Sequence, residues 1–170
     1  IGDGSLTTSV GFSTADEEIV SFVAAALPAE LKVRHQAAYD YRITTGSRGG
    51  LPTKNRVWEA LKELGLAGRN ASGKFIPEQY LFGSVEQRVM LLQGLLDTDG
   101  SVSSCYQIEF STSSEQLARD VQALVQSLGG TARRSSRLPH YHYRGQRREG
   151  QRSYRVNIAL PSQIRPFRLN

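Results

Sequence analysis

The chain contains few of the residues that form covalent cross-links or zinc sites. Its 170 residues include one cysteine and three histidines, so Cys105 cannot form an internal disulfide, and the histidines do not stand at a zinc-binding spacing from it. No apolar run approaches the ~20 residues that a membrane-spanning helix requires, and the start does not resemble a secretory signal. We therefore expect no membrane association and a reducing, intracellular setting, in the cytoplasm or at the nucleoid.

Acidic residues are scarce in the last part of the chain. Residues 1–100 carry ten basic and twelve acidic side chains, whereas residues 101–170 carry eleven basic and only four acidic ones. Most of these basic residues are arginines that lie between positions 133 and 155, with tyrosines among them. Arginine presents forked N–H donors that match phosphates and guanine edges. This pattern favours a polyanionic partner over a merely solvated loop.

Two carboxylates stand where an apolar helix is expected to end. Residues 92–100 read Leu-Gln-Gly-Leu-Leu-Asp-Thr-Asp-Gly, which places Asp97 and Asp99 at the helix C-terminus. The helix dipole disfavours negative charge there unless a cation or hydrogen-bond donors offset it. Residues 1–4, Ile-Gly-Asp-Gly, repeat the same ending and align Asp3 with Asp99. Two such endings suggest two carboxylates that meet at one metal site.

An internal repeat follows each of these endings. A strand-like stretch ends at Thr14 in the first copy and at Thr112 in the second, each preceded by Phe-Ser. Each threonine is expected to form a capping box with the glutamate three residues later and to start a helix. Further along, residues 41–44, Tyr-Arg-Ile-Thr, resemble residues 154–157, Tyr-Arg-Val-Asn. The chain is therefore predicted to contain two related halves of strands and helices.

Helical spacing of apolar residues predicts which faces are buried. Two further helices are expected, one over residues 55–64 and one that begins near Ser84, with Gln87 as its capping-box partner, and runs into residues 92–100. In the two repeated helices the predicted buried faces are Ile19, Phe22, Val23, Ala26 and Leu27 in the first, and Leu117, Val121, Leu124, Val125 and Leu128 in the second.

Residues 92–100 resemble the LAGLIDADG motif of homing endonucleases, agreeing at six of nine positions, and residues 1–4 resemble the tail of a first motif. The chain is most similar to the double-motif, single-chain branch, and closest to endonuclease domains carried by inteins, because Lys74-Phe75-Ile76-Pro77 precedes a helix that contains Arg88. The resemblance implies an α+β fold of two pseudo-twofold-related αββαββα subdomains with saddle-shaped antiparallel sheets. We assign these to residues 1–83 and 84–170, and expect the first motif helix and the C-terminus to be truncated.

The resemblance also implies the chemistry. It makes Asp3 and Asp99 the ligands of Mg²⁺ or another divalent metal, and Asp3, Asp99 and Lys74 the catalytic residues of a site-specific, double-strand DNA endonuclease. Both carboxylates supply the hard oxygen ligands that Mg²⁺ prefers. Asp97 is set aside as a ligand, since Ile1 takes its place in the first copy, and a hydrogen-bonding role is expected for it instead.

The expected partner is double-stranded DNA with a long, asymmetric target site, bound by a monomer. A β-ribbon fits the major groove, and alternate residues along each strand face the bases. The segment 138–151 is expected to grip backbone phosphates. The predicted DNA contacts are Arg34, Gln36, Arg42, Ser103, Gln107, Arg133, Arg134, Arg137, Tyr143, Arg144, Arg147, Arg148, Arg152 and Arg155.

Two other interpretations were considered. A calcium loop of the EF-hand type fails, because counting from Asp97 the sixth position is not glycine and the twelfth is Ile108. A non-catalytic nucleic-acid-binding module of the same fold, such as an RNA maturase or a transcription regulator, stays open. The acids at Asp3 and Asp99 together with Lys74 favour cleavage, because a module that only binds nucleic acid has no use for carboxylates that face phosphates.

Overall fold

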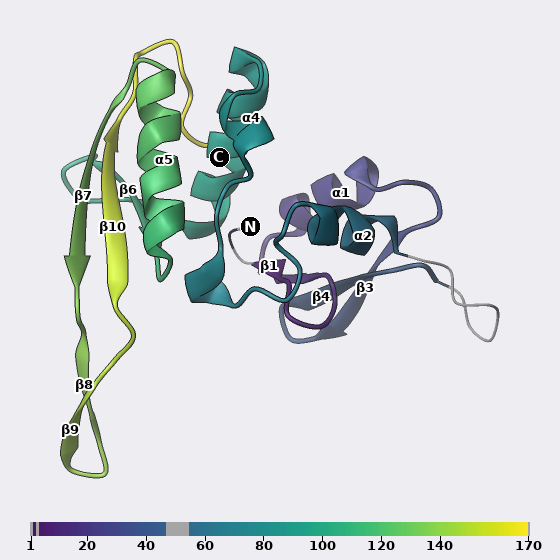
Figure 1. Ribbon diagram of the computed structural model, residues 1–170, viewed down its shortest axis with the longest axis horizontal. Coiled ribbons are helices and arrows are strands. Elements are labelled where there is room, and N and C mark those ends of the chain that lie inside the picture. Colours follow the sequence, from purple (N-terminus) through teal and green to yellow (C-terminus); the bar gives the residue numbers. More distant parts are fainter. Residues whose placement is uncertain (1, 3, 47–54, 170) are drawn as a thin grey trace. The chain divides into compact units, whose positions relative to one another are not determined.

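The computed structural model describes residues 2, 4–46 and 55–169, which divide into two compact units (Figure 1). The first unit extends to residue 70, and the second runs from residue 71 and also includes Gly2. The first contains β1 (Gly4–Ser5), β2 (Gly11–Ser13), α1 (Glu17–Ala26), β3 (Lys32–Ala37), β4 (Asp40–Thr44) and α2 (Arg56–Glu63). The second contains η1 (Ala71–Gly73), α3 (Glu78–Leu81), α4 (Val85–Asp99), β5 (Gly100–Val102), β6 (Ile108–Thr112), α5 (Glu115–Ser127), β7 (Thr131–Arg137), β8 (His140–Tyr143), β9 (Gln146–Glu149) and β10 (Ser153–Ala159).

The first unit is a four-stranded antiparallel sheet in the order β1-β2-β4-β3, with two helices. Its core is formed by Val10, Leu31 and Ile43, against which apolar residues of α1 and α2 pack. Asn55 caps α2 by accepting from the N–H groups of the first turn, and its Nδ2 donates to the Ile43 carbonyl at 2.9 Å. The same side chain therefore starts the helix and ties it to the sheet.

The second unit repeats this plan with a denser core. Its antiparallel sheet has the order β5-β6-β10-β7, and α5 lies along one face of it (Figure 1). Phe110, Val156 and the apolar stripe of α5 are almost completely excluded from solvent. The expected buried face of the second repeated helix is confirmed, since Leu117, Val121, Leu124 and Val125 are at most 1% exposed and Leu128 is 9% exposed.

The register of the two sheets shows that the repeat is structural. Gly4 pairs with Phe12 in the first sheet, and Gly100 pairs with Phe110 in the second. The aligned motif endings match the two glycines, and the Phe-Ser-Thr stretches that follow match the two phenylalanines. The predicted α+β architecture of two related antiparallel sheets is confirmed.

The second sequence echo, between residues 41–44 and 154–157, is out of step by two residues. Phe12 pairs with Tyr41, whereas Phe110 pairs with Val156 and not with Tyr154. A shift of two residues keeps every side chain on the same face of a strand, because side chains alternate with a period of two. The similarity of the two stretches therefore reflects their shared alternation and not equivalent positions.

The two repeated helices begin two residues later than the capping boxes predicted. Asp16 caps α1 and Ser114 caps α5. Thr14 and Thr112 instead accept hydrogen bonds from the backbone N–H groups of Asp16 and Ser114, at 3.1 and 3.2 Å. Each threonine thus shapes the turn that leads into the helix. The capping box of α4, between Ser84 and Gln87, is formed as expected, and α2 falls within the predicted residues 55–64.

The expected burial of α1 is only partly realised. All residues of both helices are described, and α1 has none that is fully buried, whereas α5 has six. Val23 and Leu27 pack against the core of the first unit, but Phe22 is 43% exposed. The amphipathic pattern of α1 identified the helix correctly, but it predicted Phe22 to be buried, whereas this side chain is exposed.

The segment that joins the two halves belongs to the second unit. The units divide after residue 70, whereas the subdomain boundary expected from the sequence lies after residue 83. The difference arises because residues 74–76 are hydrogen-bonded to α5, and because α3 packs against α4 and α5. Among the described residues, no helix is both long and apolar enough to cross a membrane.

Candidate active site and nucleic-acid interface

The helix α4 delivers the acidic motif to the surface of the second unit. Leu92, Leu95 and Leu96 are buried and fix its orientation, and Asp99 is its last residue. The helix stops there because the N–H of Gly100 donates to the Leu96 carbonyl and Gly100 is already extended as the first residue of β5. The carboxylate of Asp99 therefore stands at the junction between a buried helix and the sheet.

Asp97 has a different role from Asp99. Its Oδ1 accepts hydrogen bonds from the backbone N–H groups of Arg168, at 3.0 Å, and Leu169, at 3.3 Å. One turn earlier, Gln93 Nε2 donates to the Arg165 carbonyl at 2.9 Å. These donors offset the negative charge at the helix C-terminus. The hydrogen-bonding role expected for Asp97 is confirmed, and it holds the chain segment after residue 160 along α4.

Gly2 lies directly against the end of α4. A Cβ atom placed on Gly2 would lie 2.8 Å from Asp99 Oδ2 and 2.9 Å from Thr98 Cβ, and closer still to the Thr98 hydroxyl. Real Cβ atoms do not approach other atoms so closely, so only glycine fits this position. The end of the first motif copy and the end of the second therefore meet, as their repetition suggested. Asp3, the residue that follows Gly2, lies outside the described residues.

Lys74, which lies in the loop before α3, also contacts Gly2. It is half-buried, and its ammonium group donates a hydrogen bond to the Gly2 carbonyl. Lys74 thus binds the Gly2 carbonyl, and the carboxylate of Asp99 lies beside Gly2. Of the three predicted catalytic residues, the structure brings these two to one site.

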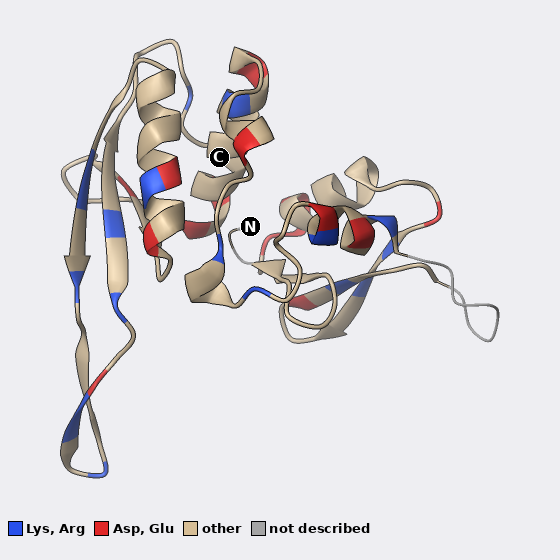
Figure 2. Ribbon diagram, in the orientation of Figure 1, with Lys and Arg blue, Asp and Glu red and all other residues tan. Residues whose placement is uncertain are grey.

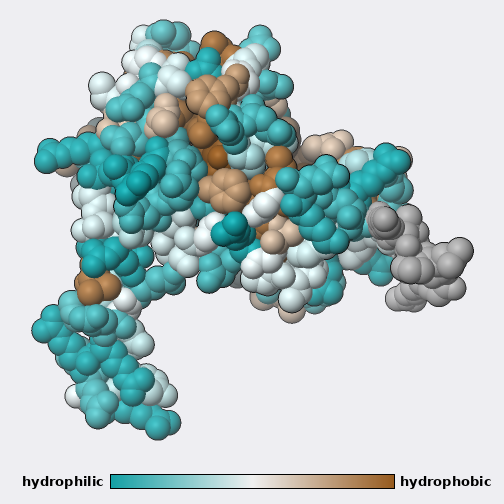
Figure 3. Space-filling model, viewed as in Figure 1, coloured by the Kyte–Doolittle hydropathy of each residue, from teal (hydrophilic) through white to brown (hydrophobic). Residues whose placement is uncertain are grey.

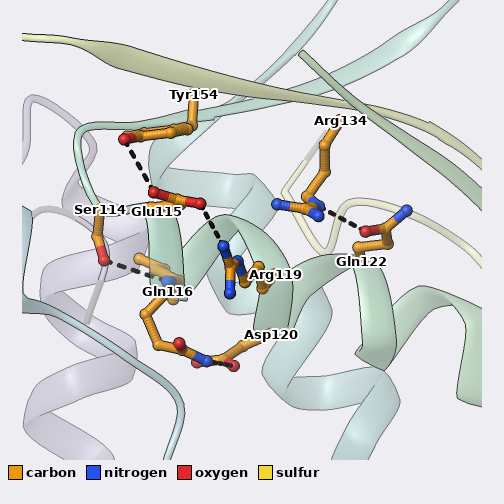
Figure 4. A network of polar contacts seen from close by, with 9 residues as sticks. Ser114, Glu115, Gln116, Arg119, Asp120, Gln122, Arg134 and Tyr154 are labelled. Atoms are coloured by element: carbon orange, nitrogen blue, oxygen red, sulfur yellow. Dashed lines mark hydrogen bonds and ion pairs between the residues drawn. The ribbon is translucent and has the colours of Figure 1, made fainter. Parts of the chain in front are cut away.

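The loop that carries Lys74 is held by the N-cap residue of α5 and by one polar residue within the helix. Ser114 Oγ donates to the Lys74 carbonyl at 2.5 Å, and Asp120 Oδ2 accepts from the Ile76 N–H at 2.8 Å. Ser114 is fully buried and Asp120 is 6% exposed. The other oxygen of Asp120 accepts from Gln116 Nε2 at 2.8 Å, as Figure 4 shows. Buried, fully bonded groups of this kind hold a loop in one position.

The face of the second sheet that lies away from α5 is polar and rich in arginine. Side chains alternate between faces, and Phe110 and Val156 point to α5, so Arg133, Arg137 and Arg155 lie on the opposite, open face. Arg155 Nε is paired with Glu109 Oε1 on this face at 2.7 Å. Ser103 and Gln107 lie in the hairpin between β5 and β6, where both are exposed.

Arg134 points to the other face of the same sheet. Its Nε donates to Gln122 Oε1 of α5 at 2.5 Å, and in Figure 4 its side chain extends from the strand to the helix. Tyr154 Oη similarly donates to Glu115 at 3.3 Å. Arg134 was grouped with the predicted DNA contacts, but the structure aligns it with α5 and not with Arg133 and Arg137.

The open face of the first sheet carries the predicted contacts of the first half. Arg34 and Arg42 pair directly across β3 and β4, and both are exposed. Gln36 and Arg42 border a hollow of about 400 Å³ that also includes Ser5, Ser13 and Asp40. Its serine hydroxyls, the Gln36 amide and the Arg42 guanidinium group offer donors and acceptors of the kind that base edges require.

A two-stranded ribbon, β8 and β9, extends from the second sheet and carries much of the positive charge (Figures 1 and 2). Tyr143, Arg144, Arg147 and Arg148 are all exposed on it, and Arg152 is exposed just before β10. The guanidinium carbons of Arg144 and Arg148 lie 5.3 and 5.1 Å from the centre of the Tyr143 ring. Figure 3 shows the ribbon as an almost entirely hydrophilic surface.

Known proteins share the sequence pattern of the second unit. A model of the LAGLIDADG-like domain family matches residues 86–165. Over these residues the chain is a member of the LAGLIDADG family. The resemblance inferred from residues 92–100 is thereby confirmed.

Solved structures of a homing endonuclease, I-DmoI, share the LAGLIDADG fold of the chain. One in complex with its target DNA and Mg is 14% identical, covers 88% of this chain and 72% of that one, and has a TM-score of 0.51. A complex with DNA and Ca has a TM-score of 0.53, with 14% identity and coverage of 89% and 68%. A structure of its mesophilic variants reaches a TM-score of 0.54, with 13% identity and coverage of 94% and 78%. At these identities the likeness shows the fold.

Sequence relatives are segments of much longer proteins. The chain is 46% identical over 69 residues to the replicative DNA helicase DnaB of Mycobacterium intracellulare, covering 41% of this chain and 11% of the helicase. It is 30% identical over 139 residues to DNA gyrase A of Mycobacterium kansasii, covering 75% of this chain and 24% of the gyrase protein. A DnaB of Synechocystis is 32% identical over 120 residues, covering 67% of this chain and 13% of that helicase. The chain thus spans less than a quarter of the length of these relatives.

Sequence reasoning missed the two residues that position the LAGLIDADG site from α5, namely Ser114 and Asp120. Asp120 offered a signal, because it stands within the apolar stripe of its helix, three residues after Leu117 and four before Leu124. A carboxylate in a buried stripe needs partners. Ser114 offered no such signal, because a serine just before a helix is common and does not by itself indicate burial.

Proposed function

We propose that the chain is a site-specific endonuclease of the homing type, which hydrolyses phosphodiester bonds in double-stranded DNA. The observation that carries this proposal is the meeting of the two motif endings at Gly2, where Asp99 and Lys74 converge. A protein that only binds DNA gains nothing from a carboxylate exposed to phosphates, since the two repel each other. A protein that cleaves DNA can use carboxylates at the scissile bond to hold a metal ion that activates water and stabilises the leaving oxygen.

We infer that Asp3 and Asp99 would hold a divalent cation, with Mg²⁺ as the expected ion. Among the described residues there is no group of three or more His, Cys, Asp or Glu side chains that could bind a metal. Two carboxylates, backbone carbonyls and water make a hard, all-oxygen ligand set, which suits Mg²⁺ better than a transition metal. When bound there, such an ion supplies Lewis-acid stabilisation of charge on a phosphodiester. I-DmoI has been solved with Mg, Ca and Mn, which supports divalent metal use in this fold.

Lys74 contributes positive charge and orientation in this proposal. Its ammonium group is held at Gly2 by the loop that Ser114 and Asp120 anchor, so little reorganisation is needed when a phosphate arrives. A pre-positioned cation beside the scissile phosphate stabilises the charge that develops during hydrolysis. The buried anchors explain how a flexible lysine side chain is placed accurately.

The open faces of the two sheets would carry sequence recognition, and the arginine-rich ribbon would add phosphate contacts. The two units differ in side chains at most open-face positions, which supports a long, asymmetric target site recognised by a monomer. Arg34, Arg42, Arg133 and Arg137 present the bidentate donors that recognise guanine in the major groove.

The relatives support an origin as an inserted element. The chain matches short parts of two unrelated enzymes, DnaB and gyrase A. One sequence that recurs within different host proteins is typical of a mobile element, and an intein is the form that resides in protein sequence. We also propose an intracellular location.

The decisive experiment is cleavage of a randomised double-stranded DNA library with Mg²⁺, followed by assays on the selected site. Asp3→Asn and Asp99→Asn are expected to lower the cleavage rate by on the order of 100-fold or more, as loss of a principal electrostatic contact does. Asp97→Asn is the matched control, because an amide oxygen still accepts from Arg168 and Leu169, and near-parental cleavage is expected.

Equal cleavage by the Asp3, Asp99 and Asp97 variants would refute the catalytic assignment. Binding of DNA without cleavage in Mg²⁺ or Mn²⁺ would instead identify the non-catalytic module, a maturase or a transcription regulator.

A further inference from the structure

The ribbon formed by β8 and β9 has two chemically different faces. Tyr141 pairs with Arg148 and Tyr143 with Gln146, so these four residues share one face. His140 pairs with Glu149 and His142 with Arg147, and these residues share the other face. All eight are exposed. Arg147 and Arg148, although adjacent in sequence, therefore point in opposite directions.

The face that carries Tyr141, Tyr143, Gln146 and Arg148, here called the tyrosine face, belongs to a ribbon that follows the second sheet directly along the chain. At the end of the sheet, Arg137 pairs with Ser153. Two residues further on, the Gly150 N–H donates to the Pro139 carbonyl at 2.7 Å, and His140 then pairs with Glu149. From Arg137 to Pro139 the outgoing strand advances by two residues, and from Gly150 to Ser153 the returning strand advances by three. One extra residue therefore lies on the returning strand, before β10, as in a β-bulge. On the outgoing side, Leu138 and Pro139 separate β7 from β8, so Arg133 and Arg137 lie on the open face of the sheet, and Tyr141 and Tyr143 lie on one face of the ribbon that follows it.

The tyrosine face also holds its cations in place. Arg144 and Arg148 both lie within cation–π range of the Tyr143 ring. A guanidinium group stacked on an aromatic ring keeps its N–H edge available for phosphate oxygens, and it loses less freedom on binding. On the opposite face, Glu149 lies 3.9 Å from His140 and adds a negative charge beside Arg147. That face is the poorer partner for a polyanion.

We propose that the ribbon binds the phosphate backbone of DNA through one face only, formed by Tyr141, Tyr143, Arg148 and the neighbouring Arg144. Arg147 and the two histidines point away from the DNA. This inference rests on the proposed DNA binding, and it revises the expectation that Arg147 and Arg148 act together. It makes the ribbon an extension of the second sheet that lies along the flanking duplex.

Arg148→Ala and Arg147→Ala are a matched pair that tests the proposal. They remove the same charge from adjacent positions, and neither side chain is part of a core. The measurement is the salt dependence of binding to a fluorescein-labelled 40-base-pair duplex of random sequence, at a fixed pH of 8. Arg148→Ala is expected to lower the slope of log K against log salt by about one, and Arg147→Ala to leave it unchanged.

Tyr143→Phe and Tyr143→Ala separate stacking from the tyrosine hydroxyl. The phenylalanine ring still supports both guanidinium groups, so its slope should equal that of the parent, whereas Tyr143→Ala should weaken binding several-fold. Equal slopes for the Arg147 and Arg148 variants, whether lowered or unchanged, would overturn the one-face proposal while the parent still binds. A parent that does not bind the duplex at all would refute the proposed function itself.

Discussion

The two sheets share a plan, yet among the described residues it is the second sheet that combines a closed core with a long extension. Both have the same strand order, and both pair the motif glycine with the phenylalanine of the next strand. Phe110 is completely buried beneath α5, whereas Phe12 is half-buried and stacks on Tyr41 with ring centres 5.4 Å apart. The repeat thus preserves hydrogen-bonding topology, while burial diverged between the halves.

The contrast is sharpest six residues after each helix cap. This position is Phe22 in α1 and Asp120 in α5, counted from Asp16 and Ser114. The phenylalanine is 43% exposed, and the aspartate is buried and bonded to the loop that carries Lys74. The carboxylate is buried because the loop of residues 74–76 packs against this side of α5 and donates to it.

The largest effect is expected from the two phenylalanines. Phe110→Ala should lower the free energy of unfolding by about 3–5 kcal/mol, because it leaves a cavity beneath α5. Phe12→Ala should cost clearly less, since part of that ring is already in water. Denaturation with guanidinium chloride measures both. Equal losses would mean that the two sheets are equally well packed.

Asp120→Ala should have the next largest effect. It leaves the buried Ile76 N–H without its acceptor, at a cost of about 1–3 kcal/mol, and it should also speed hydrogen exchange at the amide of Ile76. Phe22→Ala is the matched control in α1 and should change neither quantity by a comparable amount. A Phe22 variant as unstable as the Asp120 variant would show that the two helix positions are equivalent after all.

Glu109→Gln tests the charge balance of the open faces. Glu109 neutralises Arg155, whereas the position that corresponds to it in the first sheet is Gly11. The variant should raise affinity for random duplex DNA a few-fold and steepen the salt slope by up to about one, because Arg155 gains a phosphate partner. Arg155→Gln is the complementary variant. Unchanged binding in both variants would place this pair outside the DNA interface.

The smallest effect concerns pH. A hydrogen bond from Arg119 lowers the pKa of Glu115 at the start of α5, with its positive charge, Tyr154 and Arg134 adding to the shift. A carboxyl with a lowered folded pKa stabilises the fold above its unfolded pKa, and this stabilisation is lost as pH falls through the folded pKa.

Glu115→Gln should therefore melt slightly below the parent at pH 7, and the gap should close towards pH 3. Glu17→Gln, at the start of α1, provides the comparison for removing an acid from a first helical turn. A gap in melting temperature that stays constant with pH would rule out this ion pair as its source.

Much of this organisation was predictable from local patterns. The α4 capping box and the buried stripe of α5 both depend on short-range spacing, and both are present. The repetition of the two motif endings suggested that they meet, but it did not show that Gly2 is the residue that makes the contact. The equivalence of residues 41–44 and 154–157 was wrong by two positions, since alternation looks the same after a shift of two. The opposite orientation of Arg147 and Arg148 required knowledge of the strand register.

The sequence alone determined the family motif, the helix that carries Asp99, the repeated halves and the arginine-rich segment. These features depend on residue type and periodicity, which act within a few residues. The tertiary structure alone decided that Asp97 binds the backbone of residues 168 and 169, that Ser114 and Asp120 hold the Lys74 loop, and that Gly2 touches the end of α4. Each of these contacts joins residues at least 40 positions apart, and only the packing of helix against loop brings them within hydrogen-bonding or van der Waals distance.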